Sequence, residues 1–209
     1  MVRGTLRIRR AEARDLLALM NIERASFAPE IQESEETFAD RLNAFPGGAL
    51  ILEAGSEGNR NDREDCRRAG NCSNGSNGGN GGCRRSGEPV GYLTAEIWDK
   101  APPPSAEGYR LGHRASERHN PEGRGLYISS FAVLPKARGG TGRAFFSEAL
   151  DLLCAENPKI DRVVFIVHEQ WRAARHIYEG CGFQYTGVLP SFFKDGDAGS
   201  DALIMEKKR

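Results

Sequence analysis

The chain has 209 residues, and its 29 basic and 29 acidic side chains give a formal net charge of zero. The length suits one domain with a sizeable core, and the balanced charge argues against a general attraction to nucleic acid or to anionic membranes. Because no apolar run approaches the ~20 residues of a membrane helix and the basic N-terminus lacks the apolar stretch of a signal peptide, we expect a cytoplasmic protein that binds neither nucleic acid nor membrane.

The first half of the chain alternates extended and helical patterns. Leu6 and Ile8 alternate with arginines, as on a half-buried strand, and the two segments that follow carry apolar residues at helical spacing. Pro46, Gly47 and Gly48 end the second of these segments. The expected elements, in chain order, are a strand at 6–9, helices at 12–24 and 34–45, and strands at 49–54 and 89–98.

A low-complexity insertion at 56–87 separates the last two of these strands. Gly, Asn, Ser and Arg dominate it, so ordering it would cost backbone entropy that little apolar burial could offset. We expect a disordered insertion that enlarges the turn of a β-hairpin, which costs only a slowly growing closure entropy. Cys66, Cys72 and Cys83 lie in the insertion at spacings longer than C-x-x-C, so we expect reduced thiols and no metal site.

The second half continues the alternation of strands and helices. Residues 99–124 are polar and rich in Pro and Gly, and we expect a long loop there, which includes His113 and His119. After it come expected strands at 125–134 and 162–167, helices at 141–156 and 171–178, and two closing strands at 183–189 and 202–205. The whole order predicts a layered α/β fold.

A glycine-rich turn between an expected strand and an expected helix is the clearest functional signal. Gly139, Gly140 and Gly142 let backbone N–H groups approach a ligand without an intervening Cβ. The first amides of the following helix lack intrahelical partners and carry the positive end of its dipole. Arg138 and Arg143 add positive charge. We therefore predict a pyrophosphate site at this turn.

Two other phosphate-binding loops fit these residues less well. A P-loop needs Gly-Lys-Ser or Gly-Lys-Thr, which the chain lacks. A dinucleotide-binding fingerprint needs a small residue at the place of Phe145 and usually opens its domain.

The glycine-rich segment resembles the acyl-CoA-binding motif of the GNAT superfamily of N-acetyltransferases, in which Arg or Gln is followed after two residues by Gly, one further residue, and Gly or Ala. Gly140-Thr141-Gly142 matches the second half of that pattern, whereas Ala137 stands at the place of its Arg and Arg138 lies one position later. The resemblance implies a single mixed, largely antiparallel twisted sheet with helices on both faces. It assigns the acetyl-CoA contacts to the end of the fourth strand and to the loop: Phe131, Ala132, Val133, Arg138, Gly139, Gly140, Thr141, Gly142 and Arg143.

A second stretch of the chain strengthens this resemblance. Residues 174–183 are similar to the family's A-x-x-x-Y-x-x-x-G-F pattern, with Trp171 at the place of the Asn that often opens it. The resemblance implies that Tyr178, the Tyr of this pattern, protonates the departing CoA thiolate as general acid. Because it covers residues 5–208 apart from the insertion, we expect one N-acetyltransferase domain.

A narrower resemblance, to the arylalkylamine N-acetyltransferase branch, is carried by residues 98–100 and 119–123. That branch has two His on alternate positions of the fourth strand, where this chain has Tyr127 and Ser129. We take Trp98, Tyr127 and Ser129 as candidate substrate-binding residues.

The implied chemistry needs a general base, because an alkylammonium must lose a proton before it attacks a thioester. Glu96 and His119 are the candidates that we put forward, and His113, His168 and a water chain stay open. We predict transfer of acetyl from acetyl-CoA to a primary amine, on a small molecule or a peptide, through a ternary complex, by a monomer or homodimer that uses no metal. Two alternatives stay open: a non-catalytic CoA-binding regulatory module, and a protein N-terminal or lysine acetyltransferase.

Overall fold

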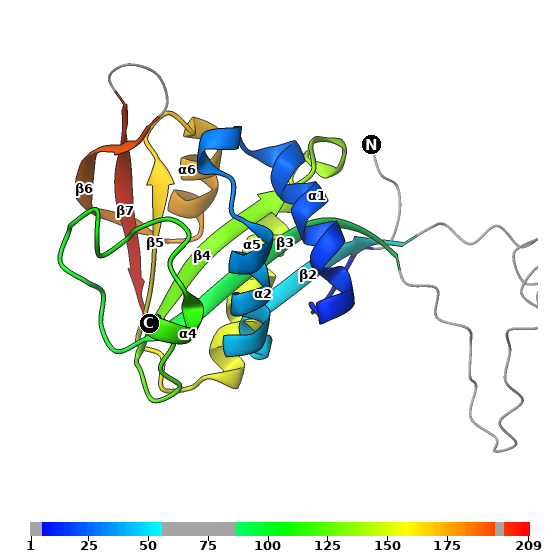
Figure 1. Ribbon diagram of the computed structural model, residues 1–209, viewed down its shortest axis with the longest axis horizontal. Coiled ribbons are helices and arrows are strands. Elements are labelled where there is room, and N and C mark those ends of the chain that lie inside the picture. Colours follow the sequence, from blue (N-terminus) through cyan, green and yellow to red (C-terminus); the bar gives the residue numbers. More distant parts are fainter. Residues whose placement is uncertain (1–5, 56–86, 195–198) are drawn as a thin grey trace, which may run out of the picture.

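The computed structural model describes residues 6–55, 87–194 and 199–209. Within these residues, strands β1 to β7 form one sheet in the order β1-β2-β3-β4-β5-β7-β6 (Figure 1). Neighbouring strands are antiparallel except β4 and β5, which are parallel. The expected single mixed, largely antiparallel sheet is therefore confirmed. All but the last residue of the predicted insertion at 56–87 lies outside the described residues.

The elements follow the predicted order, with longer closing strands than the sequence indicated. The strands are β1 (Leu6–Arg10), β2 (Ala49–Ala54), β3 (Glu88–Trp98), β4 (Gly125–Val133), β5 (Arg162–His168), β6 (Gln184–Phe193) and β7 (Ser200–Lys208). The helices are α1 (Leu16–Ser26), α2 (Glu35–Ala44), α4 (Ala115–Arg118), α5 (Thr141–Glu156) and α6 (Arg172–Gly180), with 3-10 turns η1 (Ala13–Asp15), η2 (Pro29–Ile31), η3 (Pro46–Gly48) and η4 (Pro135–Ala137). In the described part of the chain, no helix combines the length and the apolar character needed to cross a bilayer.

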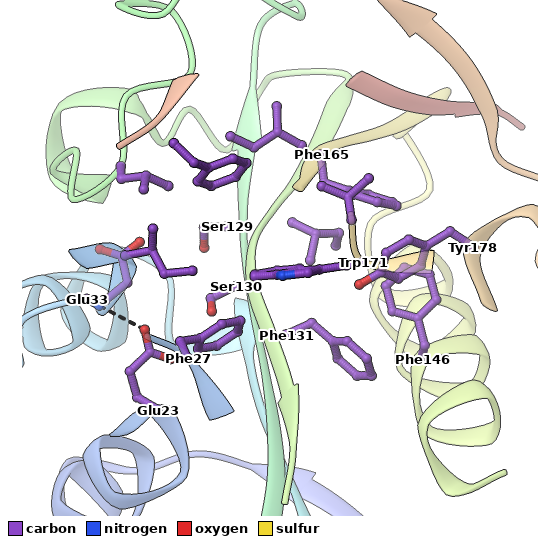
Figure 2. Close-up of a pocket in the computed structure, with 16 residues that line it drawn as sticks. Glu23, Phe27, Glu33, Ser129, Ser130, Phe131, Phe146, Phe165, Trp171 and Tyr178 are labelled. Carbon is purple, nitrogen blue, oxygen red and sulfur yellow. Dashed lines mark hydrogen bonds between the residues drawn. The ribbon is translucent and has the colours of Figure 1, made fainter. Parts of the chain in front are cut away.

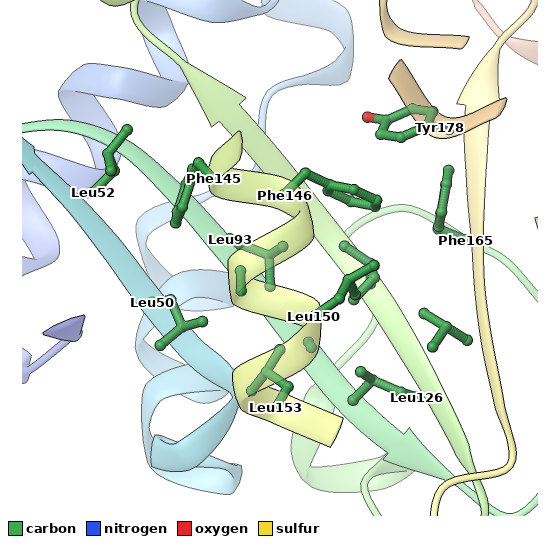
Figure 3. Close-up of a cluster of buried hydrophobic side chains, with 14 of the residues drawn as sticks. Leu50, Leu52, Leu93, Leu126, Phe145, Phe146, Leu150, Leu153, Phe165 and Tyr178 are labelled. Carbon is green, nitrogen blue, oxygen red and sulfur yellow. The ribbon is translucent and has the colours of Figure 1, made fainter. Parts of the chain in front are cut away.

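Helices cover both faces of the sheet, α1 and α2 on one face and α5 and α6 on the other (Figure 1). Strand β2 shows the reason. Leu50 and Leu52 point into the core beneath α5, whereas Ala49 and Ile51 point into the core beneath α1 and α2. Because apolar side chains leave the strand on both sides, each face needs a helical cover. The α5 side holds the larger core, with Phe146 at 0% exposure (Figure 3).

The segment between β3 and β4 is largely irregular, as predicted, but it contains the short helix α4. Hydrogen bonds from Ser116 and Arg114 hold this region to α2. Ser116 Oγ donates to Asp40 Oδ1 at 2.7 Å, and Arg114 Nη2 donates to Glu36 Oε1 at 2.7 Å. The long connection is thereby fixed over the α1–α2 face.

A β-bulge in β4 positions the functional site. The adjacent β3 residues 94–95 pair with Ser130 and Ile128, which leaves Ser129 as an extra residue in β4. The extra residue reverses the alternation of side chains, so Ile128 before it and Phe131 after it both face the α5 side. Bulges bend a strand and increase its twist, and this one lies just after Tyr127, the last β4 residue that pairs with β5.

Candidate active site

The parallel strands β4 and β5 diverge soon after they start. Their pairing runs only from Gly125 opposite Arg162 to Tyr127 opposite Val164, although β4 continues to Val133. Along the described residues beyond this pairing, neither strand has a partner on the facing edge. The splay therefore opens a gap through the middle of the sheet.

A cavity occupies this splay (Figure 2). Residues 128–131 of β4 and 165–167 of β5 form its edges. Side chains from both faces of the sheet complete the wall: Glu23, Phe27, Ile31 and Glu33 from the α1–α2 side, and Phe146 and Tyr178 from the α5–α6 side. Because the cavity connects the two faces, two ligands that approach from opposite sides can meet in it.

The turn between β4 and α5 presents free backbone amides. Gly139 and Gly140 have φ angles of 102° and 94°, values that residues with a Cβ rarely adopt. Gly140 is the N-cap residue of α5, so the amides of 140–143 have no intrahelical partners, and no described side chain caps that residue. A Cβ built on either glycine would meet nothing within 4 Å. Open space, free amides and the positive end of the helix dipole together suit a diphosphate.

Two exposed arginines flank this turn. Arg138 Nε donates to the carbonyl oxygen of Val133 at 3.2 Å, and Arg143 Nη2 donates to the carbonyl oxygen of Gly180 at 2.9 Å. A Cβ on Gly180 would lie only 3.2 Å from the Arg143 guanidinium, so glycine at this position lets the arginine lie against α6. Each guanidinium keeps further N–H donors for an anion.

The open edge of β4 directs backbone groups toward the cavity. Leu134 N–H donates to the carbonyl oxygen of Val90 on β3 at 2.8 Å. Along an antiparallel strand this pattern alternates, so the backbone groups of Phe131 and Val133 point away from β3 and toward the splay. The Val133 carbonyl agrees with this, since it accepts from Arg138 on the open side. The Phe131 N–H is thus placed to donate to an acyl oxygen in the splay.

Tyr178 of α6 lies at the α5 side of the cavity. Its ring packs against Phe146 and Phe165, with centroids 4.8 and 4.5 Å apart, and its hydroxyl points into the cavity (Figure 2). Within the part of the chain that the structure describes, this hydroxyl makes no hydrogen bond. Burial raises the pKa of Tyr178 above its ordinary value, so the phenol keeps its proton at neutral pH and can donate it to a ligand.

A buried carboxylate, Glu23 of α1, lies at the opposite side (Figure 2). Its exposure is 1%, its Oε1 accepts the N–H of Glu33 at 2.8 Å, and its Oε2 accepts the hydroxyl of Tyr92. The same hydroxyl lies 2.8 Å from Ser130 Oγ. Burial raises the pKa of Glu23, and the two hydrogen bonds offset this only in part. The carboxylate is therefore a stronger base than an exposed glutamate.

The profile of the acetyltransferase (GNAT) family matches residues 18–183. This range contains the glycine-rich turn at 139–142, the splay, Glu23 and Tyr178. The chain belongs to the acetyltransferase (GNAT) family. The structure of this acetyltransferase brings the predicted CoA contacts together, with 131–133 along the open edge of β4 and 138–143 at the turn. A search of curated proteins gives no match, and the narrower resemblance to the arylalkylamine branch stays a prediction.

Solved structures share the fold of this acetyltransferase at low sequence identity. The GphF GNAT-like decarboxylase in complex with isobutyryl-CoA is 17% identical, with a TM-score of 0.66 over 97% of this chain and 98% of that chain. The ribosomal-protein-S18-alanine N-acetyltransferase from Escherichia coli is 19% identical, with a TM-score of 0.61 over 98% and 94%. Arabidopsis thaliana NAA60 in complex with acetyl-CoA is 18% identical, with a TM-score of 0.64 over 98% of each chain.

The first predicted base, Glu96, is buried away from the cavity. It is 0% exposed, and its Oε2 accepts from His113 Nε2 at 2.8 Å and from Trp98 Nε1 at 3.0 Å. Burial opposes ionisation of Glu96, but His113 and the charge of Arg41 outweigh it and lower the pKa. A carboxylate held in this way is a weak base. The expectation that Glu96 faces the site is therefore corrected.

The second predicted base, His119, is also absent from the cavity wall. Its ring stacks on Phe45 with centroids 4.5 Å apart, and its Nδ1 accepts the N–H of Ile97 at 3.2 Å. Of the candidate substrate residues, Ser129 lines the cavity. Trp98 and Tyr127 instead stack on each other in the core, with centroids 3.9 Å apart, and the structure corrects our placement of both.

Glu23 was not among the predicted site residues, although the sequence carried a signal for it. Leu16, Leu19 and Glu23 succeed one another at spacings of three and four, which places Glu23 on the buried stripe of α1. A carboxylate within an apolar helical stripe is the informative exception in such a pattern. Glu33 gave no comparable signal, because it lies between η2 and α2 and reaches the cavity only through tertiary packing.

Proposed function

We propose that this protein transfers the acetyl group of acetyl-CoA to a primary amine within a ternary complex. One observation carries the proposal: the cavity behind the diphosphate turn has a protonated phenol, Tyr178, on one face of the sheet and a buried carboxylate, Glu23, on the other. Membership of the acetyltransferase family supports the choice of donor.

The donor is proposed to lie on the α5–α6 side. Amides of 139–143 hold its diphosphate with help from Arg138 and Arg143. Its acyl end then reaches the splay, where the Phe131 N–H donates to the thioester oxygen. The acetyl-CoA and isobutyryl-CoA complexes of the two fold relatives support a donor of this class.

Each reacting proton then has a place. Glu23 takes the proton of the arriving ammonium, directly or through water, which frees the nitrogen lone pair for attack on the thioester carbon. The N–C bond forms and the C–S bond breaks, and the sulfur takes the proton of the Tyr178 hydroxyl. The second proton that the nitrogen must lose restores the phenol, and Glu23 releases the first proton to solvent. Because Tyr178 keeps its proton at neutral pH, it is in the form that can donate. We propose Glu23 in this role in place of Glu96 and His119.

Several further assignments stay proposals. They are a single domain over 5–208 interrupted at 56–87, a cytoplasmic location, action as a monomer or homodimer, and activity without a metal. A non-catalytic CoA-binding module is the second candidate, and one observation favours it: Ala137 stands where the family motif has Arg. A protein N-terminus stays open as acceptor, supported by the fold relative that acetylates a ribosomal-protein alanine.

Turnover of acetyl-CoA distinguishes these candidates. We expect CoA to raise the melting temperature and amines to trigger release of free thiol. Tyr178→Phe should lower kcat by about 100- to 10,000-fold and leave the acetyl-CoA dissociation constant unchanged, because it removes one hydroxyl that makes no hydrogen bond with the described residues. Tyr185→Phe, at a tyrosine that is 58% exposed, is the matched control. Wild-type turnover by Tyr178→Phe would exclude its role as acid.

A further inference from the structure

We infer that the acceptor is a primary amine on an apolar substituent with no carboxylate beside the amine, and that the paired carboxylates Glu23 and Glu33 make this selection. This inference rests on the proposed function, since it names the substrate class of that same cavity. It starts from the charges that face the acceptor side.

Two carboxylates, Glu23 and Glu33, face the acceptor side of the cavity, and the guanidinium of Arg41 is ion-paired with Glu33. Glu23 makes its hydrogen bonds to neutral groups, the Glu33 amide and the Tyr92 hydroxyl. Glu33 Oε1 accepts from Arg41 Nη2 at 2.7 Å, but Arg41 Nε also lies 3.6 Å from Glu96. One guanidinium is thus shared between two carboxylates, and Glu23 adds a third. None of the described residues that line the cavity is a Lys, Arg or His.

The rest of this wall is apolar and largely aromatic. Phe27 and Trp171 meet with ring centroids 5.5 Å apart, and Trp171 lies 6.2 Å from Phe193. Ile31 and Leu111 complete the wall on the α1–α2 side. These groups bury a hydrocarbon or aromatic substituent well, and among their side chains the indole N–H of Trp171 is the one hydrogen-bond donor.

The two features together separate amines from amino acids. An ammonium is attracted by both carboxylates and by the faces of the aromatic rings. A carboxylate on the same carbon would be brought toward Glu23 and Glu33, where the described lining residues offer neutral hydroxyl and indole donors but no cation to neutralise it. Like charges placed together in this way cost several powers of ten in selectivity, so we expect a preference of at least about 100-fold.

Matched acceptors test this selection without a change of side chain. One triplet is phenethylamine, phenylalaninamide and phenylalanine, and a second is isopentylamine, leucinamide and leucine. We expect kcat/KM from thiol release to fall at least about 100-fold from the amide to the amino acid in each triplet that turns over. The amide carries no charge in place of the carboxylate, so its kcat/KM should stay within about 10-fold of that of the simple amine. A difference of this size corresponds to a small change in contacts with the pocket.

A single substitution then assigns the selection to a residue. Glu33→Gln keeps an oxygen that can accept a hydrogen bond from Arg41. It should reduce the amide-to-acid ratio, which is kcat/KM for the amino-acid amide divided by kcat/KM for the amino acid, by about 10-fold or more. The affinity for acetyl-CoA should stay unchanged. Glu30→Gln, at an exposed glutamate three residues earlier, should leave the ratio as in wild type. A thermal shift with CoA shows that each variant is folded.

The outcomes are separable. Phenylalanine or leucine acetylated as fast as its amide would overturn this inference and leave the acetyltransferase proposal intact. An unchanged ratio in Glu33→Gln would overturn the role of Glu33. Bound CoA with no thiol release for any acceptor would overturn the proposed function, and with it the inference.

Discussion

Alanine in place of Gly140 should damage both the fold and the donor site, and the structure sets the size of each effect. Gly140 has φ 94° and ψ −24°, a conformation that costs a residue with a Cβ about 1–3 kcal/mol. Because a Cβ there meets nothing within 4 Å, the cost is that of the backbone alone. For a chain of this length, about 2–4 °C is lost per kcal/mol, so the melting temperature should fall by about 2–12 °C.

Gly142→Ala adds the same methyl group two residues later and serves as the matched control. Gly142 lies in the first turn of α5, and its Cβ would meet Ile177 Cδ1 at 3.5 Å, an ordinary contact. Alanine is better than glycine in a helix by up to about 1 kcal/mol. We therefore expect a melting temperature that stays constant or rises by a few degrees, and an intact loop conformation.

Binding of CoA gives the decisive measurement. If the backbone of the Gly140→Ala variant relaxes toward negative φ at this position, at least one amide turns away from the diphosphate, and the loss of one hydrogen bond to a charged group costs about 1.5–3 kcal/mol. Calorimetric titration should then show a CoA dissociation constant raised by about 10- to 150-fold in Gly140→Ala. Acetylpantetheine, which lacks the diphosphate, should bind both variants and the wild type equally. A Gly140→Ala protein whose amide resonances show a rearranged turn, yet which binds CoA as tightly as wild type, would refute the placement of the diphosphate at this turn.

Further predictions concern the cavity and the core. Glu23→Gln should lower kcat by about 100- to 10,000-fold and remove the acidic limb of the pH–rate profile; an unchanged profile contradicts its role as base. Burial raises the pKa of Glu23 in the folded state above the ordinary glutamate pKa of 4.5. Between these two pKa values the folded protein binds this proton more strongly than the unfolded chain does. The contribution of Glu23 to the free energy of unfolding therefore falls as pH rises above 4.5. Urea melts should therefore show Glu23→Gln gaining stability relative to wild type between that pH and neutrality, and a relative loss would contradict the sign. Phe146→Ala, which empties a site of 0% exposure in the aromatic core, should lower the free energy of unfolding by about 3–5 kcal/mol, whereas a loss below about 1 kcal/mol would show that the core refills the space.

Local sequence patterns were sufficient for most of the elements and for the glycine-rich turn at 139–142. Each strand, and each helix except the short α4, follows from apolar spacing within a few residues, and the turn follows from glycines next to a helix start, so no distant contact is needed to recognise them. The prediction of Tyr178 as general acid came in the same way, from one short motif that resembles the family, and the structure places this residue at the cavity. These features depend on neighbours along the chain.

The acceptor side of the site was decided by tertiary structure. Whether a polar residue faces a cavity or a buried ion pair depends on elements far apart in the chain, and this separates Glu23 from Glu96. Both are buried glutamates, but Glu96 lies against Arg41 and His113, whereas Glu23 lies beside neutral partners at the splay. The splay itself depends on the end of β4–β5 pairing, next to the bulge at Ser129. Sequence spacing fixes which side of its own element a residue occupies, but the pairing of strands and the packing of helices over them decide what that side meets.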